Sequence, residues 1–150
     1  MKKIIMAFLF MTGVALGVRA QDKKMEIDKK DVPQAVMDGF TRKFADARDV
    51  EWKKKGDDYK VTFEIGNTDH YAMINSSGTI VYEGKEIPKS QLPAEIKNAI
   101  KKDYPNLRID DVYTVEKNGN TSYRVKLDGS PDRKVTYSSA GAVVEDKEDN

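Results

Sequence analysis

Two segments of the chain place apolar residues at every fourth position, which is the spacing of one face of a helix. The two apolar stripes consist of Val36, Phe40 and Phe44 and, sixty residues later, of Ile96, Ile100 and Tyr104. Pro33 and Pro93 precede the stripes and suit the first turn of a helix, where a missing N–H costs nothing. The spacing predicts two helices that start at these prolines and end by Asp46 and by Tyr104, each with its stripe in a core.

After each predicted helix, apolar and polar residues alternate, which is typical of a strand with one face buried. The alternation runs over residues 59–65 and again over residues 123–127. Turns rich in Gly, Asp and Asn separate these segments from preceding strands, around residues 50–54 and 112–116, and from a third and a fourth strand. Each half of the chain is therefore predicted to be a helix followed by an antiparallel meander.

The two halves are copies of one another. Residues 32–36 match 92–96, residues 59–63 match 123–127, and residues 76–81 match 139–144. The sequence predicts an α+β fold of two tandem helix-plus-antiparallel-meander repeats, with the helices on one face of the sheet and the other face open. We call residues 31–83 repeat 1 and residues 92–145 repeat 2, and we expect the polar segment 84–91, which contains Pro88, to be a linker.

Both ends of the chain differ from the repeats. Residues 1–20 carry Lys2 and Lys3 before an apolar run that ends in the small-x-small sequence 18–20, which predicts a cleavable signal peptide; a retained membrane anchor is the alternative. Residues 21–30 and 146–150 are mostly charged and are predicted to be a flexible lead-in and an acidic tail, with metal gathering as the tail's alternative role. The sequence has no cysteine, which excludes a lipid-modified cysteine and disulfides, so we expect a periplasmic or secreted protein.

The distribution of charge excludes one class of partner. The chain has 26 basic and 25 acidic residues, and cleavage would remove Lys2, Lys3 and Arg19, leaving 23 basic residues and a net charge near −2. Because the two signs are interspersed, the chain lacks the concentrated basic field that binds nucleic acid. We therefore expect no nucleic-acid partner, and no stable membrane insertion after signal cleavage.

The sequence contains no recognisable set of reactive residues. His70 is the only histidine, and a general base needs an orienting partner that the sequence does not place. A polar role at a turn-to-strand junction, matched by Arg133 in repeat 2, explains His70 better than catalysis does. The aspartates lack the spacing of a calcium loop, and the glycines occur singly rather than in a phosphate-binding cluster. The prediction is a protein without catalytic, cofactor-binding or metal-binding residues.

One asymmetry between the repeats indicates a surface. Tyr71 and Met73 align with Lys134 and Thr136, so they should face outward, and Tyr113 should join the same open sheet face. Aromatic and methionine side chains on a polar sheet are typical of a protein-binding patch, although tyrosine is also simply a good strand former. The candidate partner surface has Tyr71, Met73 and Tyr113 as anchors and a polar surround of Lys60, Arg124 and Lys126.

The repeated motifs resemble a known family. They are a Leu-Pro or Val-Pro start, the helix stripe, a Tyr-x-Val-x-Phe/Leu strand and a Ser-x-Gly-x-Ile/Val hairpin, and they cover residues 31–145. The chain resembles the PepSY-like proteins of the Bacteroidetes envelope, which are similar in architecture to the β-lactamase-inhibitor protein, a tandem repeat that binds its target across a concave sheet. The resemblance implies the fold and no catalytic residues, and an inhibitory or regulatory role only by analogy.

Two functions follow as hypotheses. The first is a non-enzymatic exported module that recognises an envelope protein or peptide across the open sheet face. The alternative is a small-molecule or glycan binding protein that uses a cleft between the two repeats, suggested by Trp52 beside the basic run 53–55. The run is equally explained as an exposed hairpin with Trp52 in the core, since the partner of Trp52 in repeat 2 is the apolar Val112.

Overall fold

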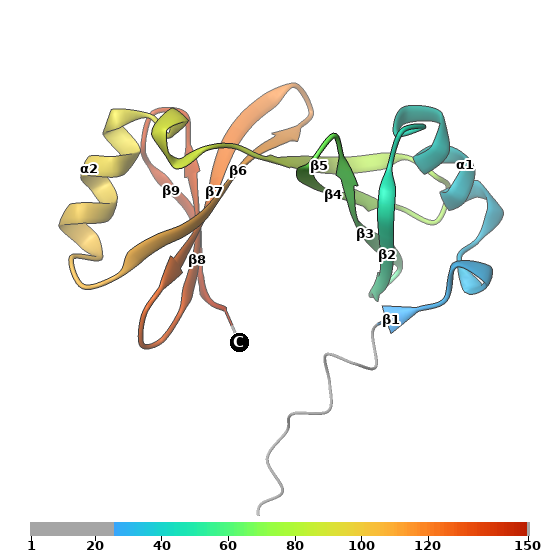
Figure 1. Ribbon diagram of the computed structural model, residues 1–150, viewed down its shortest axis with the longest axis horizontal. Helices are drawn as coiled ribbons and strands as arrows, with labels where there is room; N and C mark the ends of the chain where they lie inside the picture. The colour runs from blue at the N-terminus through green and yellow to red at the C-terminus, as the bar shows by residue number, and fades with distance from the viewer. Residues whose placement is uncertain (1–25, 150) are drawn as a thin grey trace, which may run out of the picture.

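The computed structural model describes residues 26–149, and the predicted signal peptide lies outside the described residues (Figure 1). Repeat 1 and its lead-in contain β1 (Glu26–Ile27), the 3-10 helix η2 (Lys29–Asp31), α1 (Gln34–Lys43), β2 (Arg48–Lys55), β3 (Asp58–Ile65), β4 (Thr68–Ile74) and β5 (Ile80–Glu86). The rest of the chain contains the 3-10 helix η3 (Lys89–Gln91), α2 (Ala94–Asp103), β6 (Arg108–Lys117), β7 (Asn120–Asp128), β8 (Arg133–Ser138) and β9 (Val143–Glu148).

All nine described strands form one antiparallel sheet in which spatial order follows sequence order, from β1 to β9. The helices lie at the two outer ends of the molecule, and β4, β5 and β6 bridge the space between the halves (Figure 1). Register places the core residues of both repeats on the same face of the sheet, the face that the helices cover. This arrangement confirms the predicted α+β fold class with two tandem repeats.

Each repeat has its own core, and the two cores share no residue. In repeat 1, Phe40 of α1 lies over the sheet with its ring centroid 5.2 Å from that of Trp52 and 5.1 Å from that of Phe63, both in edge-to-face geometry. In repeat 2, Ile96 and Ile100 of α2 occupy the corresponding positions and are buried. Of the predicted helix stripes, all members except Tyr104 are thus buried core residues, and Tyr104 packs partly buried against the core of repeat 2. Trp52 belongs to the core of repeat 1.

The predicted linker is wrong at its start, because Gly84–Glu86 belong to β5. β5 pairs with β4 through Tyr71↔Gly84 and with β6 through Gly84↔Val115 and Glu86↔Tyr113. The last of these pairs corresponds, at the sixty-residue offset, to Glu26↔Lys53 between β1 and β2. One strand therefore closes repeat 1 and opens repeat 2, and only the segment after it connects to α2.

Both predicted flexible ends also differ from the structure within the described residues. Ile27 pairs with Trp52 and so ties the end of the lead-in to the sheet. At the other end, residues 146–148 are the end of β9. Asp146 accepts hydrogen bonds from Nε and Nη2 of Arg133 at 2.9 and 2.7 Å and from the Tyr104 hydroxyl at 2.6 Å. These long-range contacts order a segment that is too polar to order itself.

Candidate functional site

Strand register places all six residues of the predicted surface on the face of the sheet opposite the helices, which we call the concave face. The cross-strand pairs are Lys60↔Met73 between β3 and β4, Tyr113↔Arg124 between β6 and β7, and Lys126↔Lys134 between β7 and β8. Tyr71 shares the face of Met73, since residues two apart along a strand point to the same side. Alternation along the strands and the alignment of the two repeats therefore gave the correct side of the sheet for each residue.

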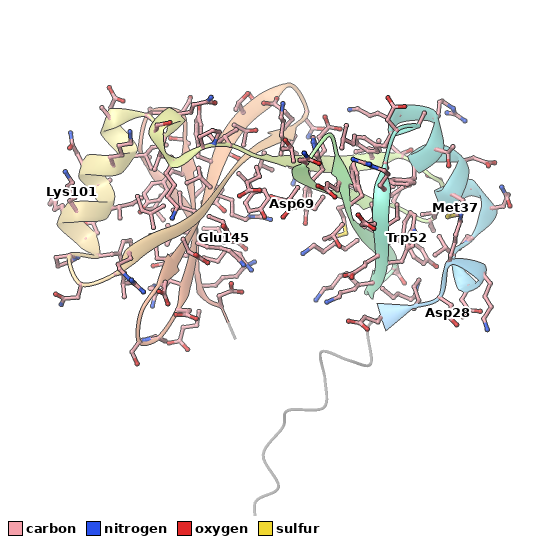
Figure 2. The ribbon with its side chains drawn as sticks, viewed as in Figure 1. Asp28, Met37, Trp52, Asp69, Lys101 and Glu145 are labelled. Atoms are coloured by element: carbon pink, nitrogen blue, oxygen red, sulfur yellow. The ribbon has the colours of Figure 1, made fainter. Side chains whose placement is uncertain are left out.

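The concave face contains a hollow of about 520 Å³ that is built by both repeats. Five of the six predicted residues line it, and Met73 does not. The wall from repeat 1 also contains Asp49, Glu51, Thr62, Phe63, Glu64, Asp69 and His70, and the wall from repeat 2 also contains Lys134 and Asp149. Figure 2 shows Asp69 between the two halves, whereas Lys101 of α2 points away from them.

Tyr71 is on the expected face, but it is not a free anchor. Only 6% of its surface is exposed, because its ring lies over Gly84 of β5 and contacts Tyr82 and Tyr113 edge-to-face at centroid distances of 6.2 and 5.4 Å. Burial raises the pKa of Tyr71 to about 12, and the positive charge of Arg124 opposes that rise. Tyr71 thus packs the joint between the repeats, which leaves Met73 and Tyr113 as the accessible apolar members of the surface.

Two cations lie beside the ring of Tyr71. Lys60 Nζ is 5.6 Å and Arg124 Cζ is 5.3 Å from its centroid, and Arg124 also lies 5.8 Å from the centroid of Tyr82. These distances fit cation–π contacts. Within residues 26–149 neither cation forms an ion pair with a carboxylate. Burial, followed by the charges of Lys134 and Arg124, lowers the pKa of Lys60 to about 8.

The remaining cations of the hollow are paired. Lys126 Nζ is 3.7 Å from Asp111 Oδ2, and Lys134 Nζ donates to Asp149 Oδ1 at 2.6 Å. Burial acts to raise the pKa of Asp149, but the hydrogen bond from Lys134 and the charges of Lys134, Lys126 and Lys60 bring it below its usual value. A carboxylate of the chain itself therefore already sits on this group of cations.

The residues that suggested a glycan site or a catalytic histidine do not form a site in the structure. Trp52 is buried under α1, and Lys54 Nζ donates to the hydroxyl of Tyr59 at 3.0 Å, so neither faces the hollow between the repeats. His70 stacks on Phe63 with ring centroids 5.5 Å apart, and burial, followed by the charge of Lys85, lowers its pKa. No hydrogen bond to a carboxylate orients His70 in the described part of the chain.

Sequence reasoning missed Gly84, Lys134 and Asp149 as parts of the site. Gly84 is required because a Cβ there would lie 2.2 Å from Cζ of Tyr71. The alignment of Tyr71 with Lys134 across the repeats was a usable signal for Lys134, since equivalent positions share a face. Nothing in the local sequence could have placed Asp149, which reaches Lys134 from the far end of β9.

Residues 26–149 contain no cluster of three or more His, Asp or Glu side chains with the arrangement of a metal site. Neither described helix has the length and apolar character needed to cross a membrane.

The tandem architecture and its concave hollow can now be compared with known proteins. The sequence profile of the family described as "Putative beta-lactamase-inhibitor-like, PepSY-like" matches twice, at residues 18–81 and 75–145. The chain belongs to this PepSY-like family. The two matches overlap at residues 75–81, where β5, the strand shared by both repeats, begins. No protein of curated function matches the chain.

Solved structures of low sequence identity share the PepSY-like fold. A protein from Bacteroides eggerthii described as "putative periplasmic" has 13% identity and a TM-score of 0.68, covering 78% of this chain and 88% of that one. A DUF2874 family protein from Bacteroides uniformis has 14% identity and a TM-score of 0.66, with coverages of 77% and 88%. A BLIP-like protein from Bacteroides fragilis has 19% identity and a TM-score of 0.60, with coverages of 85% and 91%. The likeness concerns the fold alone.

Proposed function

We propose that this PepSY-like protein is a non-enzymatic exported module that recognises a protein or peptide across its concave face. The observation that carries the proposal is the hollow of about 520 Å³, because both repeats contribute its walls and its lining combines charged side chains with the rings of Tyr71 and Tyr113. Aromatic anchors within a polar rim are the usual anatomy of a protein-binding surface. Export of the chain rests on the predicted signal peptide at residues 1–20.

The BLIP-like and periplasmic descriptions of the structural neighbours support the same kind of role. An open sheet face with helices on its other side offers a broad surface to a partner. Within the proposal, Met73 and Tyr113 are the apolar contacts, Lys60, Arg124 and Lys126 are the polar contacts, and Tyr71 keeps the two halves of the surface in place.

The test fills the hollow without changing charge. Thr62→Tyr adds a ring to the concave face on β3, and Thr121→Tyr adds the same ring on β7, where Thr121 shares the helix-side face of Tyr123. Both positions are in strands, which accept tyrosine readily. Immobilised wild-type protein should capture a partner from an envelope extract, and Thr62→Tyr should weaken the measured affinity for that partner by at least about tenfold while Thr121→Tyr does not. Equal affinity for both variants, or no captured partner, contradicts the proposal.

The second candidate is a small molecule or glycan bound in the same hollow. The observation in its favour is the volume, since hollows of roughly 300–1,000 Å³ commonly bind small molecules. Trp52 and the run 53–55 no longer support it, because they do not line this hollow. A ligand screen by thermal unfolding tests it: a bound ligand raises the melting temperature of the wild type but not of Thr62→Tyr. The absence of any such ligand in a broad screen counts against this candidate.

A further inference from the structure

The hollow concentrates positive charge on β3, β7 and β8. Lys126 and Lys134 stand directly opposite each other, and Lys134 also pairs in register with Lys147 of β9. Like charges at directly opposed positions destabilise a sheet. Lys60 on β3 faces the same cluster, with Lys134, Arg124, Lys55 and Lys53 as the charges that act on it. Lys126, Lys134 and Lys147 are compensated by ion pairs with Asp111, Asp149 and Glu145, whereas Lys60 and Arg124 have no such pair in the described part of the chain.

Two of these cations lack a charge partner among residues 26–149. Lys60 and Arg124 contact the ring of Tyr71, and Arg124 Nε makes only a long hydrogen bond of 3.5 Å to Thr136 Oγ1. A cation–π contact stabilises a cation but does not neutralise it. An anion placed beside Lys60 and Arg124 would relieve their repulsion and receive charge-assisted hydrogen bonds. Burial is the largest cause of the lowered pKa of Lys60, and the positive charges of Lys134 and Arg124 lower it further.

The structure also indicates which kind of anion fits. Asp149 already binds Lys134 of this cluster through a carboxylate oxygen at 2.6 Å. The hollow also carries Asp49, Glu51, Glu64 and Asp69 on the wall from repeat 1, which also holds Lys60, and none of these carboxylates forms an ion pair within the described residues. These carboxylates repel a densely charged polyanion, such as a nucleic acid or a sulfated glycan. An extended chain with separated carboxylates can place one carboxylate between Lys60 and Arg124 without bringing a continuous row of negative charges against these four side chains.

The geometry points to a carboxylate-binding site between Lys60 and Arg124, which takes Asp or Glu side chains from an extended acidic segment of a partner protein. This inference rests on the proposed function and specifies the chemistry of its partner. The site is distinct from the pairs Lys126–Asp111 and Lys134–Asp149, which stay closed when the segment binds. Arg124 offers a planar fork to a carboxylate, and Lys60 offers a single charged donor from the opposite repeat.

The experiment uses an acetylated and amidated peptide of alternating Ser and Glu, seven residues long, titrated into isotope-labelled protein and followed by amide chemical shifts. We expect saturable shifts in β3 and β7, and much weaker binding of the same peptide with Gln in place of Glu. Lys60→Gln/Arg124→Gln should weaken the binding of the Glu peptide at least about tenfold, as expected for lost charge-assisted hydrogen bonds. Lys101→Gln/Lys102→Gln, which removes the same charge from the outer face of α2, should leave it unchanged.

A charge-conserving variant separates charge from folding. Lys60→Arg/Arg124→Lys keeps both cations, so it should retain measurable affinity for the Glu peptide, above that of Lys60→Gln/Arg124→Gln, although Arg and Lys bind a carboxylate with different geometry. Equal binding of the Glu and Gln peptides, unchanged binding by Lys60→Gln/Arg124→Gln, or loss of binding in the charge-conserving variant overturns the inference. So does the absence of saturable binding, or tighter binding of inorganic phosphate or of a sulfated oligosaccharide than of the Glu peptide.

These outcomes are separable from failure of the proposed function. Suppose that the wild type captures a partner, that Thr62→Tyr loses it, and that the protein shows no preference for the Glu peptide. The proposed function then stands, and only the inference of an acidic segment fails. If Thr62→Tyr does not weaken the affinity for the Glu peptide, the hollow is not the surface that binds the peptide.

Discussion

In repeat 1 the space between helix and sheet is filled by Phe40, Trp52 and Phe63, whereas the corresponding residues of repeat 2 are Ile100, Val112 and Leu127. Larger side chains elsewhere in repeat 2 compensate in part, since Ala72 and Ile74 of β4 are replaced by Val135 and Tyr137 of β8. The same fold therefore tolerates an aromatic core and a largely aliphatic one, provided that total volume and alternation are kept.

The repeats also fasten the end of the helix to the sheet differently. In repeat 1, Lys43 of α1 forms an ion pair with Glu83 of β5. In repeat 2 the equivalent of Glu83 is Asp146, whose partners are Arg133 of β8 and the hydroxyl of Tyr104 beyond α2. The carboxylate stays at one structural position while the cation moves from the helix to the neighbouring strand. Repeat 2 thereby gains a polar network where repeat 1 has an aromatic cluster.

The largest effect should come from the two cores. Phe40→Ala removes a ring that contacts Phe44, Trp52 and Phe63 and should cost about 4 kcal/mol of unfolding free energy, whereas Ile100→Ala should cost about 3 kcal/mol. Urea unfolding followed by circular dichroism measures both values. Fluorescence of Trp52, the single tryptophan, reports on repeat 1 alone. A larger loss for Ile100→Ala would contradict the expectation that the ring of Phe40 contributes more to the core of repeat 1 than Ile100 contributes to the core of repeat 2.

A smaller effect is expected at the joint between the repeats. Gly84→Ala places a methyl group against the ring of Tyr71 and should cost about 2 kcal/mol, the usual range for overpacking. In a double-mutant cycle, Tyr71→Ala should remove most of the additional cost of Gly84→Ala, because the clash then has no partner. Thermal unfolding measures the stability of each variant. If the losses of stability from the two substitutions are additive, the backbone of β5, and not the ring of Tyr71, requires glycine at position 84.

The polar network comes next. Asp146→Ala leaves Arg133 and the Tyr104 hydroxyl without their common acceptor and should cost about 1.5 kcal/mol, because hydrogen bonds to charged groups are the stronger ones. Glu83→Ala should cost under about 1 kcal/mol, as is usual for a partly exposed ion pair. Hydrogen exchange should show loss of protection in β9 for Asp146→Ala only. Equal losses of stability for the two variants would mean that the Asp146 network and the Lys43–Glu83 ion pair stabilise their repeats equally.

The smallest effect is a pH dependence that belongs to the concave face. The pKa of Lys60 is about 8 in the folded protein, below its usual value of 10.5, so the unfolded chain binds more protons between these values. Stability should therefore rise with pH from about 8 to 10, by about 0.5 kcal/mol after solvent screening, relative to Lys60→Met. Urea unfolding of both proteins across this range measures the difference. If the stability of the wild type relative to Lys60→Met falls as the pH rises, the charge of Lys60 stabilises the folded protein and the prediction is wrong.

Most of the fold could be predicted from sequence because its signals are local. The stripes of four-residue spacing gave both helices, and alternation gave β3 and β7. Alignment of the two repeats gave the correct face for Tyr71 in β4, and Tyr113 in β6 also lies on the expected face. β5 was missed where Glu83, Gly84 and Lys85 interrupt the alternation, since its pairing with β6 is long-range. The acidic tail was predicted to be flexible because its partner, Arg133, lies in another strand.

The candidate site was predicted less completely, because it too depends on contacts between strands that are distant in sequence. Alternation placed Lys60 and Arg124 on the right face, but it could not show that both contact one ring. The burial of Tyr71 depends on Gly84 in the neighbouring strand, and a residue's own sequence context does not report the size of its cross-strand neighbour. Sequence reasoning therefore gave faces of the sheet, while contacts across strands decided which residues are accessible.

The sharing of β5 between the repeats has a mechanical consequence. Two lobes on a flexible tether could swivel independently, but here an unbroken ladder of main-chain hydrogen bonds runs from β4 through β5 into β6. Changing the angle between the lobes requires twisting or shearing that ladder, and the ring of Tyr71 over Gly84 stiffens it on the inner side. The two lobes are therefore held at one angle, so the width of the concave face is set before the proposed partner binds.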